Sequence, residues 1–435
     1  MSEKPKKREL RFKYRKTHFF RQSERLALFN EYRDMPKEAK YLIYSSIFPS
    51  LAYGMFYTDL SYFLTTVQGL SYELMGTVIT LMGVSTVIAS IPLGIAADKY
   101  GRKRFLVLGN VLASSIIAVF ALTTNPALLV LAAIVEGVSE ASFSASTNAL
   151  LAEKAGDTRR NSAFSLAGFA QGIAFGVGSF MIPVVVIFSA FGLTSGESHV
   201  LLYVILAAIS LASTLIMLKI SESKNLKKAH AGVRELLPKK SIRVLMKYVL
   251  TSAIIAFGAG MVVPLMAAWL KAQYGISDAI SGPILGVSNI VIGVATLAAP
   301  PLARRIGIVK AIVATQAFST IFMFATPLFP DYVSASVVYT SRSFLMNMAS
   351  PLQQSMIMGL VAEDERGAAS GVSAALWRLP NALSSFIGAY LIGIGLLAAP
   401  FFLAAVLYIV SIALFWYYFR NTRMPEEETT KNVAN

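Results

Sequence analysis

The chain has 435 residues, of which 55% are hydrophobic and only 14% charged, and its mean hydropathy is +0.60. A soluble protein of this length would carry about 25% charged residues, so the composition excludes an ordinary soluble domain. The apolar residues occur in blocks of roughly twenty, the length that a helix needs to cross a bilayer. Because these blocks are continuous and do not alternate with polar residues, they predict membrane-spanning helices and exclude a β-barrel.

The net charge of +15 is explained by where the basic residues lie. Twelve predicted spans leave both tails and every second connection on one side of the membrane. Nearly all of the 39 Lys and Arg fall on that side; the exceptions are Lys271 in a loop on the other side, and Arg342 and Arg378 inside spans. This positive-inside distribution predicts cytoplasmic termini and argues against a nucleic-acid partner. The predicted spans are residues 41–66, 72–95, 105–124, 127–150, 162–190, 199–218, 246–270, 278–302, 308–328, 332–358, 368–392 and 397–419.

Two sequence echoes indicate an internal repeat. A Gly-Val-Ser that begins at Gly83 recurs at Gly286 (286 − 83 = 203), and an Ala-Glu that ends at Glu153 recurs at Glu363 (363 − 153 = 210). Parallel repeats of six helices are a known transporter plan. We therefore expect an all-α integral membrane protein of two pseudo-symmetric six-helix bundles. The expected boundaries are a basic N-terminal tail 1–40, bundles 41–218 and 246–419, a cytoplasmic central loop 219–245 and a C-terminal tail 420–435.

The predicted turn between spans 2 and 3 concentrates charge in GIAADKYGRKR, residues 94–104. Its pattern, G-x-x-x-D-[RK]-x-G-[RK]-[RK], resembles the signature motif of the major facilitator superfamily. The related turn in the second half, residues 303–307, keeps its glycine and basic residues but lacks the aspartate. The residues that match the motif are Gly94, Asp98, Lys99, Gly101, Arg102 and Lys103.

This resemblance covers the chain from about Tyr41 to Phe419. It implies two six-helix bundles around a central cavity, lined mainly by spans 1, 4, 7 and 10, and alternating access by rocking of the halves. It also implies that the motif is a cytoplasmic gate, in which Asp98 faces the start of span 11, near Gly367 to Gly371, in the outward-facing state.

Charged side chains inside a membrane are costly and mark functional candidates. Glu136 and Glu140 lie one turn apart on the same face of span 4, near the midplane. Two carboxylates at this spacing in a desolvated site suit a proton carrier or a site for a cationic substrate. The structural alternative is an ion pair with an arginine that locks the bundle.

Three further charges lie inside predicted spans. Arg342, near the midplane of span 10, is expected to bind an anionic group or to pair with Glu136 across the cavity. Arg378 in span 11 is expected either to join the site or to form a structural salt bridge. Asp59, in the outer third of span 1, is expected to be an extracellular gate, a proton access point or a solvated helix end.

An enzyme is not expected. The three histidines, His18, His199 and His230, fall in a predicted tail or loops. No zinc-protease motif, complete P-loop or nucleophile elbow occurs, and the chain has no cysteine. We therefore expect neither a cofactor nor a metal.

The sequence as a whole predicts a secondary transporter in the plasma membrane that moves a small organic solute by alternating access with proton coupling. The alternatives are an organic-anion uniporter or exchanger centred on Arg342, a multidrug/proton antiporter, and a non-transporting sensor or scaffold on the same fold. The expected partners are the solute, protons and anionic inner-leaflet lipids at the basic loops, with the protein as a monomer. Gly172 and Gly176 are expected to allow close packing of span 5, and Trp269 to anchor the end of span 7 at the membrane surface.

Overall fold

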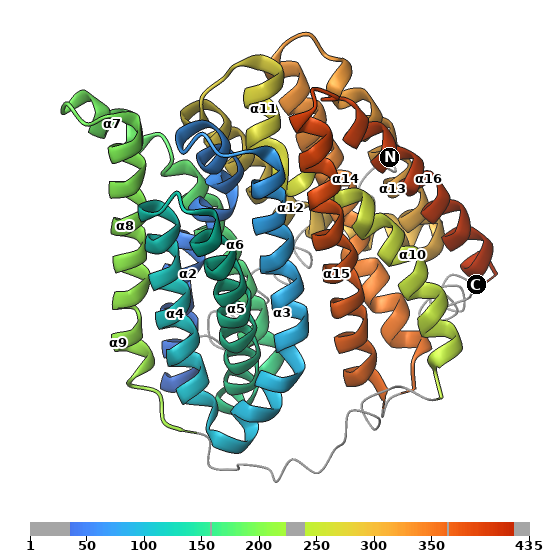
Figure 1. Cartoon of the computed structure of the whole chain (residues 1–435). Coiled ribbons are helices and arrows are strands. Elements are labelled where there is room, and N and C mark those ends of the chain that lie inside the picture. The colour runs from blue at the N-terminus through green and yellow to red at the C-terminus, as the bar shows by residue number, and fades with distance from the viewer. Residues whose placement is uncertain (1–34, 157–158, 223–239, 363–364, 422–435) are drawn as a thin grey trace, which may run out of the picture.

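The computed structural model describes residues 35–156, 159–222, 240–362 and 365–421. Within these ranges nearly every residue is helical and no strand occurs, which confirms the all-α prediction. Figure 1 shows the blue-to-green helices of the first half gathered on one side and most helices of the second half on the other. Most of both tails and of the central loop lie outside the described residues, so the predicted domain boundaries stay predictions.

Twelve long helices follow one another along the described chain, one for each predicted span. They are α2 (Lys37–Tyr62), α3 (Tyr72–Tyr100), α4 (Arg102–Leu122), α5 (Pro126–Ala155), α6 (Arg160–Phe180), α8 (Ser195–Ala212), α10 (Ile242–Gly260), α12 (Asp278–Ile306), α13 (Ile308–Ala325), α14 (Tyr332–Leu360), α15 (Arg366–Gly393) and α16 (Ala399–Phe419). The short elements are η1 (Phe63–Val67), α7 (Val184–Ala190), α9 (Thr214–Met217), η3 (Val263–Leu265), α11 (Met266–Tyr274) and η4 (Thr326–Leu328).

Local sequence signals set several helix ends. Asn125 accepts hydrogen bonds from the first backbone amides of α5, and Pro126 occupies the first turn, where its missing N–H is not needed. Thr194 and Glu197 form a reciprocal capping box at the start of α8. Gly101 links α3 to α4 with a φ of +116°, a conformation that favours glycine.

Eight stretches of the described chain are long and apolar enough to cross a membrane. The long helices α2, α14 and α15 are not among them, and α12 contributes only a shorter apolar stretch, Asp278–Gly293. The reason is that α2, α14 and α15 carry many polar side chains, and much of this polarity faces the cavity described below. Hydropathy therefore identifies the membrane-crossing helices least well where their polar side chains line the cavity.

Glycines bring helices into close contact within the first half. A Cβ on Gly178 of α6 would overlap the carbonyl oxygen of Leu51 on α2, and a Cβ on Gly54 of α2 would overlap that of Phe175. The expectation for Gly172 is wrong, because a Cβ there would meet nothing within 4 Å. Gly176 does allow a close contact, since its Cβ would lie 2.7 Å from Ile290 on α12.

Replacing Gly178 with alanine is therefore expected to destabilise the protein by about 1–3 kcal/mol, because backbone must move to accept the methyl group. Gly172→Ala, six residues earlier on the same helix, is the matched control. It is expected to be neutral or slightly stabilising, since alanine favours the helix by up to about 1 kcal/mol. Thermal unfolding of both purified variants checks this, and equal melting temperatures would contradict the packing.

The halves touch at one end of the molecule and diverge at the other. We call the end that holds the α3–α4 turn and the start of α10 the basic end, and the end that holds η1, α7 and α11 the opposite end. Between α3 and α15, Gly76 packs on Phe386 and Gly83 on Ala382, whereas a Cβ on Gly94, nearer the basic end, would meet nothing within 4 Å. Helices α6 and α12 also touch only toward the opposite end: a Cβ on Gly176 would meet Ile290 of α12, whereas a Cβ on Gly172, nearer the basic end, would meet nothing within 4 Å. The space between the halves is thus closed at the opposite end.

Trp269 belongs to the core that closes this end. Its side chain is 1% exposed, packs on Phe401 with ring centroids 4.6 Å apart, and donates a hydrogen bond of 2.8 Å from Nε1 to the carbonyl oxygen of Leu397. The prediction of a membrane-surface anchor is wrong, because α11 folds inward beside the start of α16.

Candidate transport cavity

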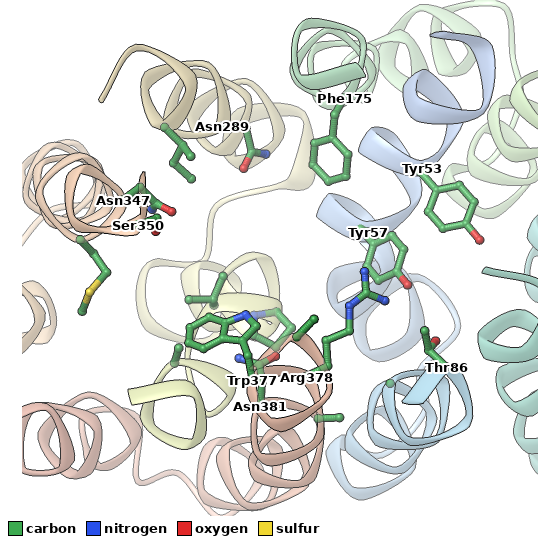
Figure 2. Close-up of a pocket in the computed structure, with 18 of the residues that line it drawn as sticks. Tyr53, Tyr57, Thr86, Phe175, Asn289, Asn347, Ser350, Trp377, Arg378 and Asn381 are labelled. Carbon is green, nitrogen blue, oxygen red and sulfur yellow. The ribbon is translucent and has the colours of Figure 1, made fainter. Parts of the chain in front are cut away.

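A cavity of about 960 Å³ lies between the halves. Figure 2 shows its lining contributed by both halves, with Tyr53, Tyr57 and Phe175 facing Asn289, Trp377 and Arg378. Residues nearer the basic end, including Asn148, Gln354 and Ser370, also line it. The cavity therefore extends toward the end where the halves diverge.

Two of the predicted site residues, both glutamates of α5, accept hydrogen bonds from tyrosines of α2 beside this cavity. Glu136 is fully buried, and its Oε1 accepts a hydrogen bond of 2.6 Å from the hydroxyl of Tyr53. The Tyr57 hydroxyl lies 3.4 Å from Glu136 Oε1 and 3.5 Å from Glu140 Oε2, so it bridges the two acids. Thr86 of α3 donates to Glu140 Oε2 at 3.3 Å. No described residue donates a hydrogen bond to the second oxygen of Glu136, Oε2.

Arg378 connects this acid pair to the second half. Its Nη1 lies 2.9 Å from Glu140 Oε1, in an ion pair between α15 and α5. The side chains of Arg378 and Glu140 are 46% and 24% exposed, so the pair borders the cavity and is not sealed in the core. In Figure 2 the guanidinium group of Arg378 points toward Tyr57. Arg378 thus forms the predicted salt bridge and also lines the cavity, and its part in transport stays a prediction.

Arg342 lines the cavity without an acidic partner. It is 4% exposed, donates a hydrogen bond of 2.8 Å to the Tyr408 hydroxyl, and lies over the rings of Tyr339 and Tyr408 at 5.6 and 5.9 Å. Its Nε finds no hydrogen-bond acceptor among the described residues. The alternative in which Arg342 pairs with Glu136 is not seen; among the described residues no carboxylate forms an ion pair with Arg342.

Asp59 lies near the opposite end and is fully buried, so the expectation of a solvated helix end is wrong. Its Oδ2 accepts a hydrogen bond of 3.1 Å from Tyr203 of α8. His199, predicted in a loop, lies in the first turns of α8 and is buried. Its Nε2 is 2.7 Å from Oδ2 of Asp278, the first residue of α12. Sequence reasoning missed both His199 and Asp278.

Asp59, His199 and Asp278 bring three potential metal-ligand atoms within 4.8 Å of one another. A zinc ion with ligands about 2.0–2.2 Å away in tetrahedral directions would separate two ligand atoms by more than about 3 Å. The 2.7 Å between His199 and Asp278 is instead a hydrogen-bond distance. We interpret this cluster as a hydrogen-bonded network.

The motif residues lie together at the basic end. Asp98 Oδ1 is 2.7 Å from Arg102 Nε, and Arg102 Nη1 is 3.1 Å from Oε2 of Glu153, so the motif ties α3, α4 and α5 together. The backbone amide of Lys103 donates to Glu222 at 3.0 Å. No ion pair between Asp98 and α15 is seen within the described part of the chain. The predicted gate contact with span 11 stays a prediction.

The remaining motif residues surround this turn. Gly101 leaves room for Glu222, because a Cβ would lie 2.6 Å from its Oε2. Lys99 lies over the ring of Tyr100 at 5.0 Å. A Cβ on Gly94 would have open space around it.

The sequence profile of the Major Facilitator Superfamily matches residues 42–385 and, in a second match, 249–434. The chain belongs to this family. Uncharacterized membrane protein YJR124C of Saccharomyces cerevisiae is 22% identical over 385 residues, which cover 77% of this chain and 86% of the yeast protein.

Solved structures show the same fold. A mutant of the nucleoside transporter NupG has a TM-score of 0.74 at 16% identity, covering 88% of this chain and all of its own. A bacterial homolog of the human lysosomal transporter Spinster, in an inward-facing and unoccupied conformation, has a TM-score of 0.71 at 13% identity, covering 87% and 96%. A peptide transporter of the POT family, in an auto-inhibited state, has a TM-score of 0.71 at 12% identity, covering 89% and 98%. Membership of this family makes the chain a membrane transport protein, and the solved structures share its fold.

Proposed function

We propose that this protein is a proton-coupled secondary transporter that moves a small organic solute across the plasma membrane by alternating access. The observation that carries the proposal is the buried Glu136, which forms no ion pair with any described residue, beside an ion pair of Glu140 and Arg378 that joins the halves. A buried carboxylate without a counter-charge costs several kcal/mol. Glu136 is therefore most stable here as a neutral acid that carries a proton.

Tyr57 supplies a path between the two acids. Its hydroxyl is within reach of one oxygen of each, and a hydroxyl both donates and accepts hydrogen bonds. When Glu140 is released from Arg378, it becomes a free carboxylate one turn from Glu136. A proton then moves between them through Tyr57, so that breaking the contact between the halves and transferring the proton occur together.

The same proposal assigns the ends of the molecule. The basic end faces the cytoplasm by the positive-inside rule, so the closed opposite end is extracellular and the cavity belongs to an inward-facing state. Arg102 and Lys103 lie where anionic inner-leaflet lipids reach them. In the outward-facing state Asp98 contacts the start of α15 and closes the basic end. The protein acts as a monomer.

Arg342 favours a second candidate, exchange of an organic anion without protons. The Glu140–Arg378 pair is internally neutral, so Arg342 supplies the remaining formal charge among the described cavity-lining residues. Within the described ranges its Nε donor has no hydrogen-bond acceptor. A carboxylate or phosphate group of a substrate would accept bidentate hydrogen bonds from Nε and a neighbouring Nη of Arg342.

A thermal-shift measurement with three ligand panels tests the choice. The panels are lipophilic cations such as tetraphenylphosphonium, organic anions such as succinate, and neutral solutes that include sugars, nucleosides and short peptides. An anion at 100 times its dissociation constant is expected to stabilise the wild type by about 2.7 kcal/mol, and Arg342→Ala to lose this effect while Glu136→Gln keeps it. Stabilisation by cations alone, lost in Glu136→Gln, would instead favour a multidrug antiporter. If no panel stabilises the wild type, a soluble-solute site loses its support.

A further inference from the structure

The network of Asp59, His199 and Asp278 joins the two halves at the closed opposite end. Asp59 on α2 and His199 on α8 belong to the first half, whereas Asp278 begins α12 in the second half. All three residues are at most 4% exposed. Opening this end would separate α12 from α2 and α8, and would break the hydrogen bond of 2.7 Å between His199 and Asp278.

The hydrogen bonds of His199 reveal a bound proton. Its Nδ1 lies 2.6 Å from the carbonyl oxygen of Ser195, which only accepts, so Nδ1 carries a hydrogen. Its Nε2 lies 2.7 Å from a carboxylate oxygen of Asp278. A neutral imidazole protonated at Nδ1 would place two lone pairs against each other at this contact. A further proton must therefore lie between Nε2 and Asp278, on one atom or the other.

The groups around this contact are all acids, phenols or neutral. Asp59 and Tyr62 face it from α2, Tyr203 from α8, and Asp278 from α12. Phe63 covers the imidazole with ring centroids 5.8 Å apart. The Oδ1 atom of Asp59 is buried and accepts no hydrogen bond from the part of the chain that the structure describes. The carboxylate of Asp278, in direct contact with the imidazole of His199, favours retention of the extra proton in the closed form.

We propose that Asp59, His199 and Asp278 form a second proton-binding site, which holds the opposite end closed and releases its proton when that end opens. On opening, His199 meets water, where an imidazole loses its second proton near neutral pH. Because the closed form binds the extra proton, acid favours closure and alkaline pH favours opening. This inference rests on the proposed proton-coupled function and adds a site from which a proton is released on the extracellular side.

The chain has no cysteine, so paired spin labels can be introduced directly into the natural full-length background. Phe191 after α7 and Leu328 in η4 are exposed residues of the two halves at the opposite end. Double electron–electron resonance between Phe191→Cys and Leu328→Cys reports closure. The closed-to-open ratio is expected to fall at least about tenfold between about pH 5.5 and about pH 8.5, since one proton contributes up to tenfold per unit.

His199→Gln is the decisive variant, because glutamine offers an amide donor to Asp278 but takes up no proton. Its closed-to-open ratio is expected to lose most of the wild-type dependence on pH, and any dependence that remains is assigned to Glu136. Asp278→Asn serves the same purpose if the first variant does not fold. Ser114→Ala is the matched control. It removes a buried hydrogen bond of 2.7 Å from α4 to Ser210 on α8, the helix that also carries His199, and is expected to keep the wild-type response.

Four outcomes would overturn the inference. A pH response that survives in both His199→Gln and Asp278→Asn would place the proton elsewhere. A response that is lost in Glu136→Gln but kept in these variants would leave the proposed function standing without this second site. Closure that EDTA abolishes and zinc restores would make the cluster a metal site. If the wild type itself shows no pH response, closure is linked to a proton neither at Glu136 nor at this cluster.

Discussion

Replacing Arg378 with alanine is expected to slow solute exchange by about 30-fold. The change leaves Glu140 without its cation, one turn from a second acid, and removes the ion pair that joins α5 to α15. Removing one partner of a fully buried pair costs about 3–5 kcal/mol. This pair borders the cavity, so water reduces the effect to about 2 kcal/mol, which corresponds to about 30-fold. Counterflow in proteoliposomes, with the ligand that stabilises the wild type, measures the rate.

Three variants separate this effect from loss of folding. Arg378→Lys keeps the charge and is expected to retain most exchange. The double variant Glu140→Gln with Arg378→Gln restores neutrality and is expected to regain thermal stability but not proton coupling. Arg420→Ala, at the exposed end of α16, is a matched arginine control and is expected to leave exchange unchanged. Wild-type exchange in Arg378→Ala would show that the pair has no part in transport.

Glu136→Gln is expected to abolish accumulation against a gradient while leaving exchange intact. Glutamine keeps the shape of the side chain and an oxygen that accepts the 2.6 Å hydrogen bond from Tyr53, so the cavity is preserved. It carries no titratable proton. With one proton per solute, a gradient of about 2 pH units drives about 100-fold accumulation in the wild type, and this accumulation should disappear in the variant.

Gln171→Ala is the control for this experiment. Gln171 also lines the cavity and donates a hydrogen bond of 3.1 Å to Ser46, but its side chain has no titratable proton. Its accumulation ratio is expected to match that of the wild type. Loss of both exchange and accumulation in Glu136→Gln would assign Glu136 to solute binding and not to coupling.

Much of the helical architecture follows from the sequence because apolar blocks and helix length are local properties. Glu136 and Glu140 were expected on one helix face from their spacing alone, and the structure places both beside Tyr57. The partner of Glu140 was not predictable, because it depends on how α15 rotates against α3. Arg342 was expected near the cavity, but its contact with Tyr408 depends on the packing of α16.

The network at the opposite end was missed for an identifiable reason. The predicted sixth span began at His199, which left this residue at a loop boundary. The capping box of Thr194 and Glu197 is a sequence signal that places the helix start earlier, at Ser195. One additional turn puts His199 inside the helix. Even so, its contact with Asp278 joins the two halves, and no local pattern reports such a contact.

The most direct test of the account is proton movement itself. Purified protein is reconstituted into liposomes that contain the pH-sensitive dye pyranine, and the ligand that stabilises the wild type is added outside without a pH gradient. We expect the internal pH to change when the ligand enters through the wild type, and to stay constant in Glu136→Gln although radiolabelled ligand still exchanges. Ligand entry through the wild type with no change in internal pH, at matched membrane potential, would contradict proton coupling and favour anion exchange at Arg342.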